Sequence, residues 1–209
     1  MENPSFSQQF KLVSASANYW VIFILPLLCS GLIVWLTLSR IYPFDRDPII
    51  VKNALEEWSL YITGAFCFLS LLRFLHSQEK FCLWATGLLM LFHFREFHPP
   101  NANIVTYSGL IWFFYYAYKN HHFFADYLRG KYLITLLGVG FFSYLIAVAT
   151  DERVWKDFIP IPGEQEFHNK LEETLELIGH IAIGCALLFA TKNPPENPAG
   201  TKSEDSIRI

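Results

Sequence analysis

Long apolar stretches alternate with short polar connections along this chain. Six of them have the length and composition of a helix that crosses a bilayer, which needs roughly 20 mostly apolar residues at a rise of about 1.5 Å each. The pattern therefore predicts an all-α fold, a polytopic membrane helix bundle with about six transmembrane helices. The predicted spans are 19–38, 58–76, 81–97, 104–118, 132–150 and 171–191.

Two of these stretches, 81–97 and 104–118, lie near the lower length limit for a span. They are either two full crossings, which we favour, or the two arms of a re-entrant hairpin. Around the predicted bundle 19–191, the chain has a polar N-terminal segment, 1–18, and a Pro-rich polar tail, 192–209, which is predicted to be disordered. The predicted loops are 39–57, 77–80, 98–103, 119–131 and 151–170.

The composition supports a membrane protein and excludes several other classes. Hydrophobic residues make up 53% of the chain and charged residues 17%, whereas soluble domains carry roughly a quarter charged residues. The net charge of −3, without a basic patch, excludes a nucleic-acid binder. The four cysteines lie in apolar stretches without a C-x-x-C pair, so no disulfide framework is expected. The expected partner is membrane lipid, and a homo-oligomer or a larger membrane complex stays open.

The distribution of Lys and Arg predicts the orientation of the bundle. Six spans place both termini on one side of the membrane, and that side carries nine of the cationic residues against seven on the other. Cytoplasmic loops are enriched in Lys and Arg. We therefore expect cytoplasmic termini, and the short loops without sorting signals indicate a bacterial inner membrane.

Ionisable side chains within a predicted span are candidates for function, because a charge in a membrane helix costs several kcal/mol unless it has a partner. The last span carries Glu173, Glu176 and His180 at positions i, i+3 and i+7. This spacing places them within about 60° of one helix face. Such a stripe suits a divalent metal or a proton path. The alternative is that the glutamates favour a helix N-terminus and that His180 bonds to a neighbouring helix.

A second group of ionisable residues ends the third predicted span, in the sequence LFHFREFHPPNAN. If the spans alternate in direction, the end of this span, the end of the fifth span and the start of the sixth lie on one side of the membrane. We therefore predict that Glu176 and His180 are buried between helices, with His93, Glu96 or His98 within reach. The alternative is an interfacial network in which arginines pair with carboxylates and nothing is bound.

These observations lead to three hypotheses for function. The first is a membrane enzyme that acts on a lipid or an amphiphile, with Asp151 or Glu173 as catalytic proton acceptor. The second is a small proton-coupled transporter, and the third is a non-catalytic accessory or scaffold protein. The cofactor in the first hypothesis is a divalent metal, whose predicted ligands are His93, Glu96, His98, Glu176 and His180.

Three short fragments resemble, in degraded form, the motif series of the CAAX-type intramembrane metalloproteases. They are the pair Glu56 and Glu57, the F-x-x-x-H pattern of 94–98 and the H-x-x-x-polar pattern of 122–126. The sequence departs from the family in two places. The paired glutamates lack the arginine that follows them in the family, and the third fragment is predicted on the opposite side of the membrane. No family is assigned on this basis.

Overall fold

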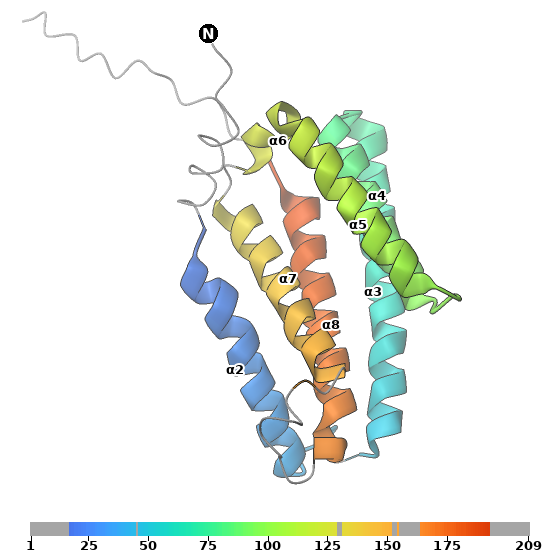
Figure 1. Cartoon of the computed structure of the whole chain (residues 1–209), viewed down its shortest axis with the longest axis vertical. Coiled ribbons are helices and arrows are strands. Elements are labelled where there is room, and N and C mark those ends of the chain that lie inside the picture. Colours follow the sequence, from blue (N-terminus) through green and yellow to red (C-terminus); the bar gives the residue numbers. More distant parts are fainter. Residues whose placement is uncertain (1–16, 45, 129–130, 152–153, 155–163, 193–209) are drawn as a thin grey trace, which may run out of the picture.

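The computed structural model describes residues 17–44, 46–128, 131–151, 154 and 164–192. These residues form helices and no strand, so the all-α prediction is confirmed. Successive long helices run in opposite directions (Figure 1). We call the end that carries α6 the upper end and the end where α8 begins the lower end. The helices are α2 (Tyr19–Leu38), α3 (Pro48–Ser77), α4 (Lys80–Glu96), α5 (Ala102–Lys119), α6 (His121–Leu128), α7 (Lys131–Asp151) and α8 (Glu164–Phe189).

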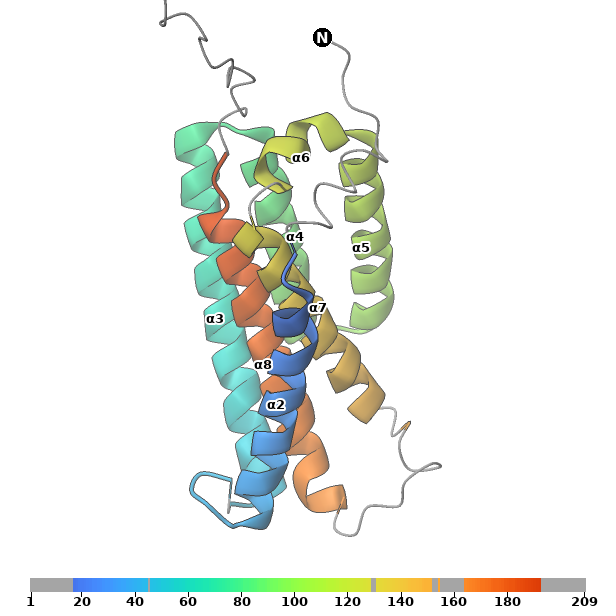
Figure 2. The same ribbon diagram turned by 90° about the vertical axis from the view of Figure 1, so that its left-hand side faces the viewer.

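Helix α8 is the central element of the bundle. It packs against α2, α3, α4 and α7, whereas α5 packs against α4 and α6 at the edge of the bundle (Figures 1 and 2). Helices α7 and α8 approach each other closely at two glycines. A Cβ atom on Gly140 would meet Cγ1 of Ile183 at 2.4 Å and the carbonyl oxygen of Gly179 at 3.1 Å. These glycines therefore let two helix backbones come together, as small residues do between membrane helices.

Three helices, α2, α3 and α7, are long and apolar enough to cross a membrane. Helix α8 has the length but carries many charged residues, and those whose side chains are described lie partly or wholly inside the bundle. The outer surface of the bundle is rich in exposed apolar side chains, such as Trp20, Ile111 and Phe189. Charge inside and apolar groups outside is the opposite of the arrangement that water favours.

The helices begin and end beyond several of the predicted limits. Helix α3 begins at Pro48, ten residues before the predicted span, because the Asp47 side chain accepts a hydrogen bond from the Ile49 amide at 2.8 Å and Pro48 suits a first turn. Helix α8 begins seven residues early, and α6 lies in a predicted loop. The predictions that 39–57, 119–131 and 151–170 are loops were therefore wrong in part. Hydropathy detects the apolar stretch of a helix and misses the polar turns that extend beyond it.

Most of the predicted terminal segments lie outside the described residues. The N-terminal segment is described only at residues 17 and 18, and the tail only at residue 192.

The two short predicted spans are two separate antiparallel helices, α4 and α5, joined by residues 97–101. The structure is therefore compatible with two crossings there.

The upper half of the bundle has an aromatic core, which we call the upper core. Phe81 of α4 stacks on Tyr127 of α6 with ring centroids 3.9 Å apart, and Trp84 meets Phe124 edge to face. Ile183 and Leu187 of α8 are buried in the same cluster. The top of α8 is capped by Arg73, which donates to the carbonyl oxygens of Leu187 at 3.1 Å, Leu188 at 2.5 Å and Ala190.

Candidate functional site

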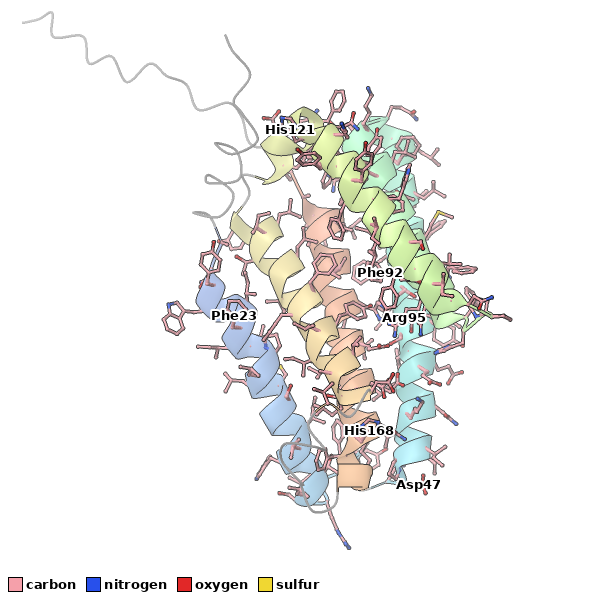
Figure 3. All side chains as sticks on the ribbon, viewed as in Figure 1. Phe23, Asp47, Phe92, Arg95, His121 and His168 are labelled. Carbon is pink, nitrogen blue, oxygen red and sulfur yellow. The ribbon has the colours of Figure 1, made fainter. Side chains whose placement is uncertain are left out.

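Four titratable side chains follow one another along α8 at intervals of four residues, and we call them the α8 ladder: His168, Glu172, Glu176 and His180. Residues i and i+4 are neighbours on a helix surface, and each step rises by about 6 Å, so the ladder extends over about 18 Å. It begins near the lower end, where Figure 3 labels His168, and reaches the middle of the bundle, where Figure 3 labels Arg95. All four side chains are at least partly buried, because α8 is surrounded by other helices.

The inner part of the ladder meets the lower end of α4. Arg95 donates a hydrogen bond to Oε1 of Glu176 at 2.5 Å, and Oε1 of Glu96 lies 3.3 Å from Nε2 of His180. Glu176 is 8% exposed and His180 is 3% exposed. The predicted placement of these two residues is therefore confirmed, with Glu96 as the residue within reach.

The imidazole of His180 is incompletely satisfied. Its Nε2 faces Glu96 at the distance of an ion pair but without the angle of a hydrogen bond, and its Nδ1 has no hydrogen-bond partner among the described residues. The edges of Phe92 and Tyr144 flank the ring, with centroids at 6.1 Å and 5.2 Å. A buried polar atom without a partner costs about 1–3 kcal/mol. His180 therefore offers a position for a bound water, proton or ligand group.

The start of α3 contributes a cation to the middle of this region. Lys52 lies 3.1 Å from Oε1 of Glu173 and 3.5 Å from Oε1 of Glu56. Glu173, a predicted catalytic residue, is thus paired rather than free. Lys52 was not among the predicted site residues because residues 39–57 were predicted to form a loop, whereas α3 carries this lysine alongside α8.

Two of the predicted metal ligands lie away from the ladder. Nδ1 of His93 is 2.9 Å from the hydroxyl of Thr63 on α3, and His98 is an exposed residue whose Nδ1 lies 3.0 Å from the carbonyl oxygen of Glu96. The carboxylate of Glu176 forms an ion pair with Arg95. The structure therefore distributes the five predicted ligands over four separate contacts and does not gather them around one point.

A different group of ligand atoms comes together at the lower end. Asp151 from the end of α7 meets His168 and Glu172 from α8, with one ligand atom of each residue within 4.8 Å of the others. It is the one group of three His, Cys, Asp or Glu residues with this spacing in the part of the chain that the structure describes. Asp151 was predicted as a proton acceptor. His168 was missed because residues 151–170 were assigned to a loop, although the H-x-x-x-E spacing of 168 and 172 signals a shared helix face.

A cavity of about 270 Å³ opens at the same end of the bundle. Three of its charged lining residues are cations, Arg40, Arg46 and Lys170, and one is an acid, Asp47. Lys170 donates from Nζ to the carbonyl oxygen of Phe44 at 2.5 Å. Figure 3 labels Asp47 at the lower tip of the bundle. The cavity is therefore mainly cationic and lies beside the start of the ladder.

Above His180 the ladder does not continue. The buried residues of α8 beyond this point are Ala182, Ile183, Gly184, Ala186 and Leu187, and several of them pack into the upper core. The polar region thus reaches the middle of the bundle from one end only. The three fragments that resemble the metalloprotease series do not meet either, because α6 lies at the upper end, away from Glu56 and Glu96 (Figure 1).

Comparison of the chain with protein-family models, with curated proteins and with solved structures finds no match. The site therefore rests on its own geometry: a one-sided ladder of titratable groups, a group of three metal-type ligands at its lower end and a cationic cavity beside it.

Proposed function

We propose that the chain is an integral membrane protein whose six long helices all cross the bilayer, with cytoplasmic termini in a bacterial inner membrane. The exposed apolar side chains and the three helices with the properties of spans support this arrangement. Helices α4, α5 and α8 run antiparallel to their neighbours along the same bundle axis, and the charges of α8 lie inside. In this orientation the lower end faces the extracytoplasmic side.

Within that setting we propose an enzyme that acts on a lipid or another amphiphile from the lower end of the bundle. The observation that carries the proposal is the one-sided ladder that ends at His180, whose buried Nδ1 has no partner among the described residues and whose Nε2 lies beside Glu96. A carboxylate and an imidazole at this distance can pass a proton to and from a reacting group. An amphiphile in the membrane presents its polar end at the depth where the ladder begins.

The cationic cavity supports an anionic head group as the part of the substrate that is recognised. Arg40 and Arg46 belong to the chain between α2 and α3, and Lys170 lies two residues from His168 on α8. Guanidinium groups bind phosphate oxygens in a bidentate manner. We therefore propose a phosphate-bearing lipid or amphiphile as the substrate class.

The apolar residues above His180 oppose the transporter hypothesis. Transport requires access from both sides in turn, and the upper core separates the ladder from the upper end. Vesicles that contain the protein and a pH-sensitive dye should therefore show the same proton flux as empty vesicles when a pH gradient is applied. A flux that disappears with His180→Leu would favour transport instead.

A non-catalytic scaffold is the second candidate, and it is favoured by the ion pairs themselves. Arg95 with Glu176 and Lys52 with Glu173 join α4 and α3 to α8, so they would fix the relative positions of these helices without any reaction. Buried charge pairs are known to serve such a role in setting register.

The two candidates can be separated by direct assay. Purified protein in vesicles made from a total bacterial lipid extract is incubated for several hours, and mass spectrometry then measures every new or depleted lipid species. We expect at least one product with the wild type and a rate lowered by about 100-fold or more in Glu96→Gln and His180→Gln. Glu57→Gln, an exposed change in the lower half of α3, should retain the wild-type rate.

The scaffold makes the opposite forecast. No lipid species would change in amount with the wild type, and the two variants would differ from it only in stability. Equal rates in wild type and His180→Gln would also overturn the assignment of His180.

A further inference from the structure

We propose that Asp151, His168 and Glu172 form a binding site for one divalent transition-metal ion at the lower end of the bundle. The site joins the end of α7 to the first turns of α8. It is a different site from the ligand set that the sequence suggested. It also does not depend on the proposed enzyme, because a metal can bind here whether or not the protein is a catalyst.

The first argument is the geometry of the ligand atoms. Ligands of Zn²⁺ lie about 2.0–2.2 Å from the metal, so two ligand atoms on one ion are at most about 4.4 Å apart. The three atoms in the group lie within 4.8 Å of one another. Binding would require the two carboxylates to rotate toward the ion about their side-chain bonds.

The second argument is the placement of the ligands on rigid elements. His168 and Glu172 are at positions i and i+4 of α8, which directs both toward the same side. Asp151 comes from the antiparallel helix α7, which packs against α8 along its length. A site made by two helices gives better fixed ligand positions than a site made by a loop.

The third argument is the local charge. Asp151 and Glu172 bring two negative charges together when His168 is neutral, and neither carboxylate forms an ion pair with another described residue. The nearby cation Lys52 is paired with Glu173 and Glu56 instead. Lys52 and Arg95 act on Glu172 only from beyond ion-pair distance, so a divalent cation bound between the two carboxylates would balance their charges more directly.

The site is also reachable from solution. Asp151 is exposed and Glu172 is half-buried, while His168 is buried behind them. An ion can therefore enter from the lower end of the bundle and meet the carboxylates first. The imidazole then selects among ions, since nitrogen ligands suit Zn²⁺ and Fe²⁺ better than Mg²⁺ or Ca²⁺.

The experiment measures binding of the metal itself. The full chain is purified in detergent, stripped with EDTA, and titrated separately with Zn²⁺, Mn²⁺ and Mg²⁺ by calorimetry, and bound metal is counted after gel filtration. We expect about one equivalent of Zn²⁺, weaker binding of Mn²⁺, and binding of Mg²⁺ that is at least tenfold weaker than that of Zn²⁺. Asp151→Asn, His168→Gln and Glu172→Gln should each lower the affinity for Zn²⁺ by at least about tenfold.

Matched controls remove a histidine and a carboxylate outside the group. His76→Gln and Glu57→Gln change exposed residues of the same types and should keep the wild-type affinity. Binding should also raise the thermal midpoint of the wild type, because a ligand of the folded state stabilises it. Asp151→Asn should lose this rise while keeping the midpoint of the metal-free protein, since Asp151 is exposed.

Three results would overturn the proposal. One is a wild type that retains less than a tenth of an equivalent of every metal after gel filtration. Another is unchanged affinity in all three variants. The third is loss of binding in His98→Gln but not in His168→Gln, which would favour the ligand set suggested by the sequence. None of these outcomes decides whether the protein turns over a lipid, so failure here leaves the proposed enzyme to its own assay.

Discussion

The two halves of the bundle are held together by different forces, although the same helix, α8, runs through both. In the upper half, α8 places Ile183 and Leu187 against stacked aromatic rings. In the lower half it places glutamates and histidines against Arg95, Glu96 and Lys52. Contacts of the first kind are spread over many atoms and tolerate some change of shape. Contacts of the second kind depend on a few partners.

This difference shows where function is best sought. In a bilayer an apolar core needs no explanation beyond packing, because it only exchanges lipid contacts for side-chain contacts. Charged groups in the interior of the same bundle are expensive unless each has its partner. The lower half therefore carries the groups whose presence calls for a role, and variants in the two halves should behave differently.

The largest effect is expected from breaking the Arg95–Glu176 pair. Arg95→Leu leaves the carboxylate of Glu176 buried without its cation, which we expect to lower the free energy of unfolding by about 3–5 kcal/mol. The measurement is an SDS titration in mixed micelles followed by circular dichroism. The double change Arg95→Leu with Glu176→Leu should recover most of the loss, because the isolated charge is gone. A single variant as stable as the wild type would show that Glu176 has another partner or carries no charge.

A change in the upper core should have a smaller effect and a different character. Phe81→Ala removes a ring that stacks on Tyr127, and we expect a loss of about 3 kcal/mol from the emptied space. Phe189→Ala changes an exposed ring and should alter stability by less than about 0.5 kcal/mol. The alternative substitution Phe81→Leu keeps more of the side-chain volume than Phe81→Ala and should therefore cost less stability. Equal effects of Phe81→Ala and Phe189→Ala would contradict the described core.

The close contact between α7 and α8 can be tested by adding a methyl group at Gly140. Gly140→Ala would bring its Cβ to 3.1 Å from the carbonyl oxygen of Gly179 and against Ile183, so the helices must separate slightly. We expect a loss of about 1–3 kcal/mol. Gly31→Ala on α2 meets nothing within 4 Å and should be neutral or stabilising by up to about 1 kcal/mol. If both changes stabilise the protein equally, the close approach of α7 and α8 is wrong.

The smallest effect belongs to an ion pair at the upper surface, outside the predicted spans. Hydrogen bonds from Lys192 and Tyr127 hold the pKa of Glu79 below its usual value of 4.5. A carboxyl whose pKa is lowered on folding stabilises the protein above its unfolded pKa, and this stabilisation is lost as the pH falls through the lower, folded pKa. Glu79→Gln should therefore lower stability at pH 6 and lose less stability than the wild type on acidification below about pH 4.5.

Lys192→Gln provides the matched test of this pair, because it removes the ammonium group that donates to Glu79 and keeps the hydrogen bond from Tyr127. We measure the thermal midpoint of Lys192→Gln between pH 3 and 7. Its pH profile should lie closer to that of Glu79→Gln than to that of the wild type. Parallel pH profiles for the wild type and Glu79→Gln would show that the pair contributes nothing in solution.

Hydropathy and helix parity predicted the general plan of the fold from the sequence. Span 19–38 coincides with α2, and the opposite directions of successive helices place the end of α4 beside the first half of α8. The burial of Glu176 and His180 follows from the same reasoning, since a charge on a membrane helix needs a partner in the protein. These features are set by length and by charge, which a single sequence displays.

The details of the candidate site could not be predicted in the same way. Whether Glu176 binds a metal or pairs with Arg95 depends on the rotation of α4 about its axis, which is set by packing with α3 and α8. Lys52 and His168 lie in polar extensions of helices that hydropathy does not mark. The N-cap of Asp47 and the i, i+4 spacing of His168 and Glu172 were signals that could have located both.

The position of α8 in the chain has a consequence for the biogenesis of the protein. Its charged partners Lys52, Arg73, Arg95 and Glu96 belong to helices that leave the ribosome before it does. In the proposed membrane setting, Lys52 and Arg95 would lack Glu173 and Glu176 as partners until α8 is inserted. Insertion of α8 would then act as the step that locks the earlier helices in place, and a nascent chain stalled before residue 164 would be a natural target for membrane quality control.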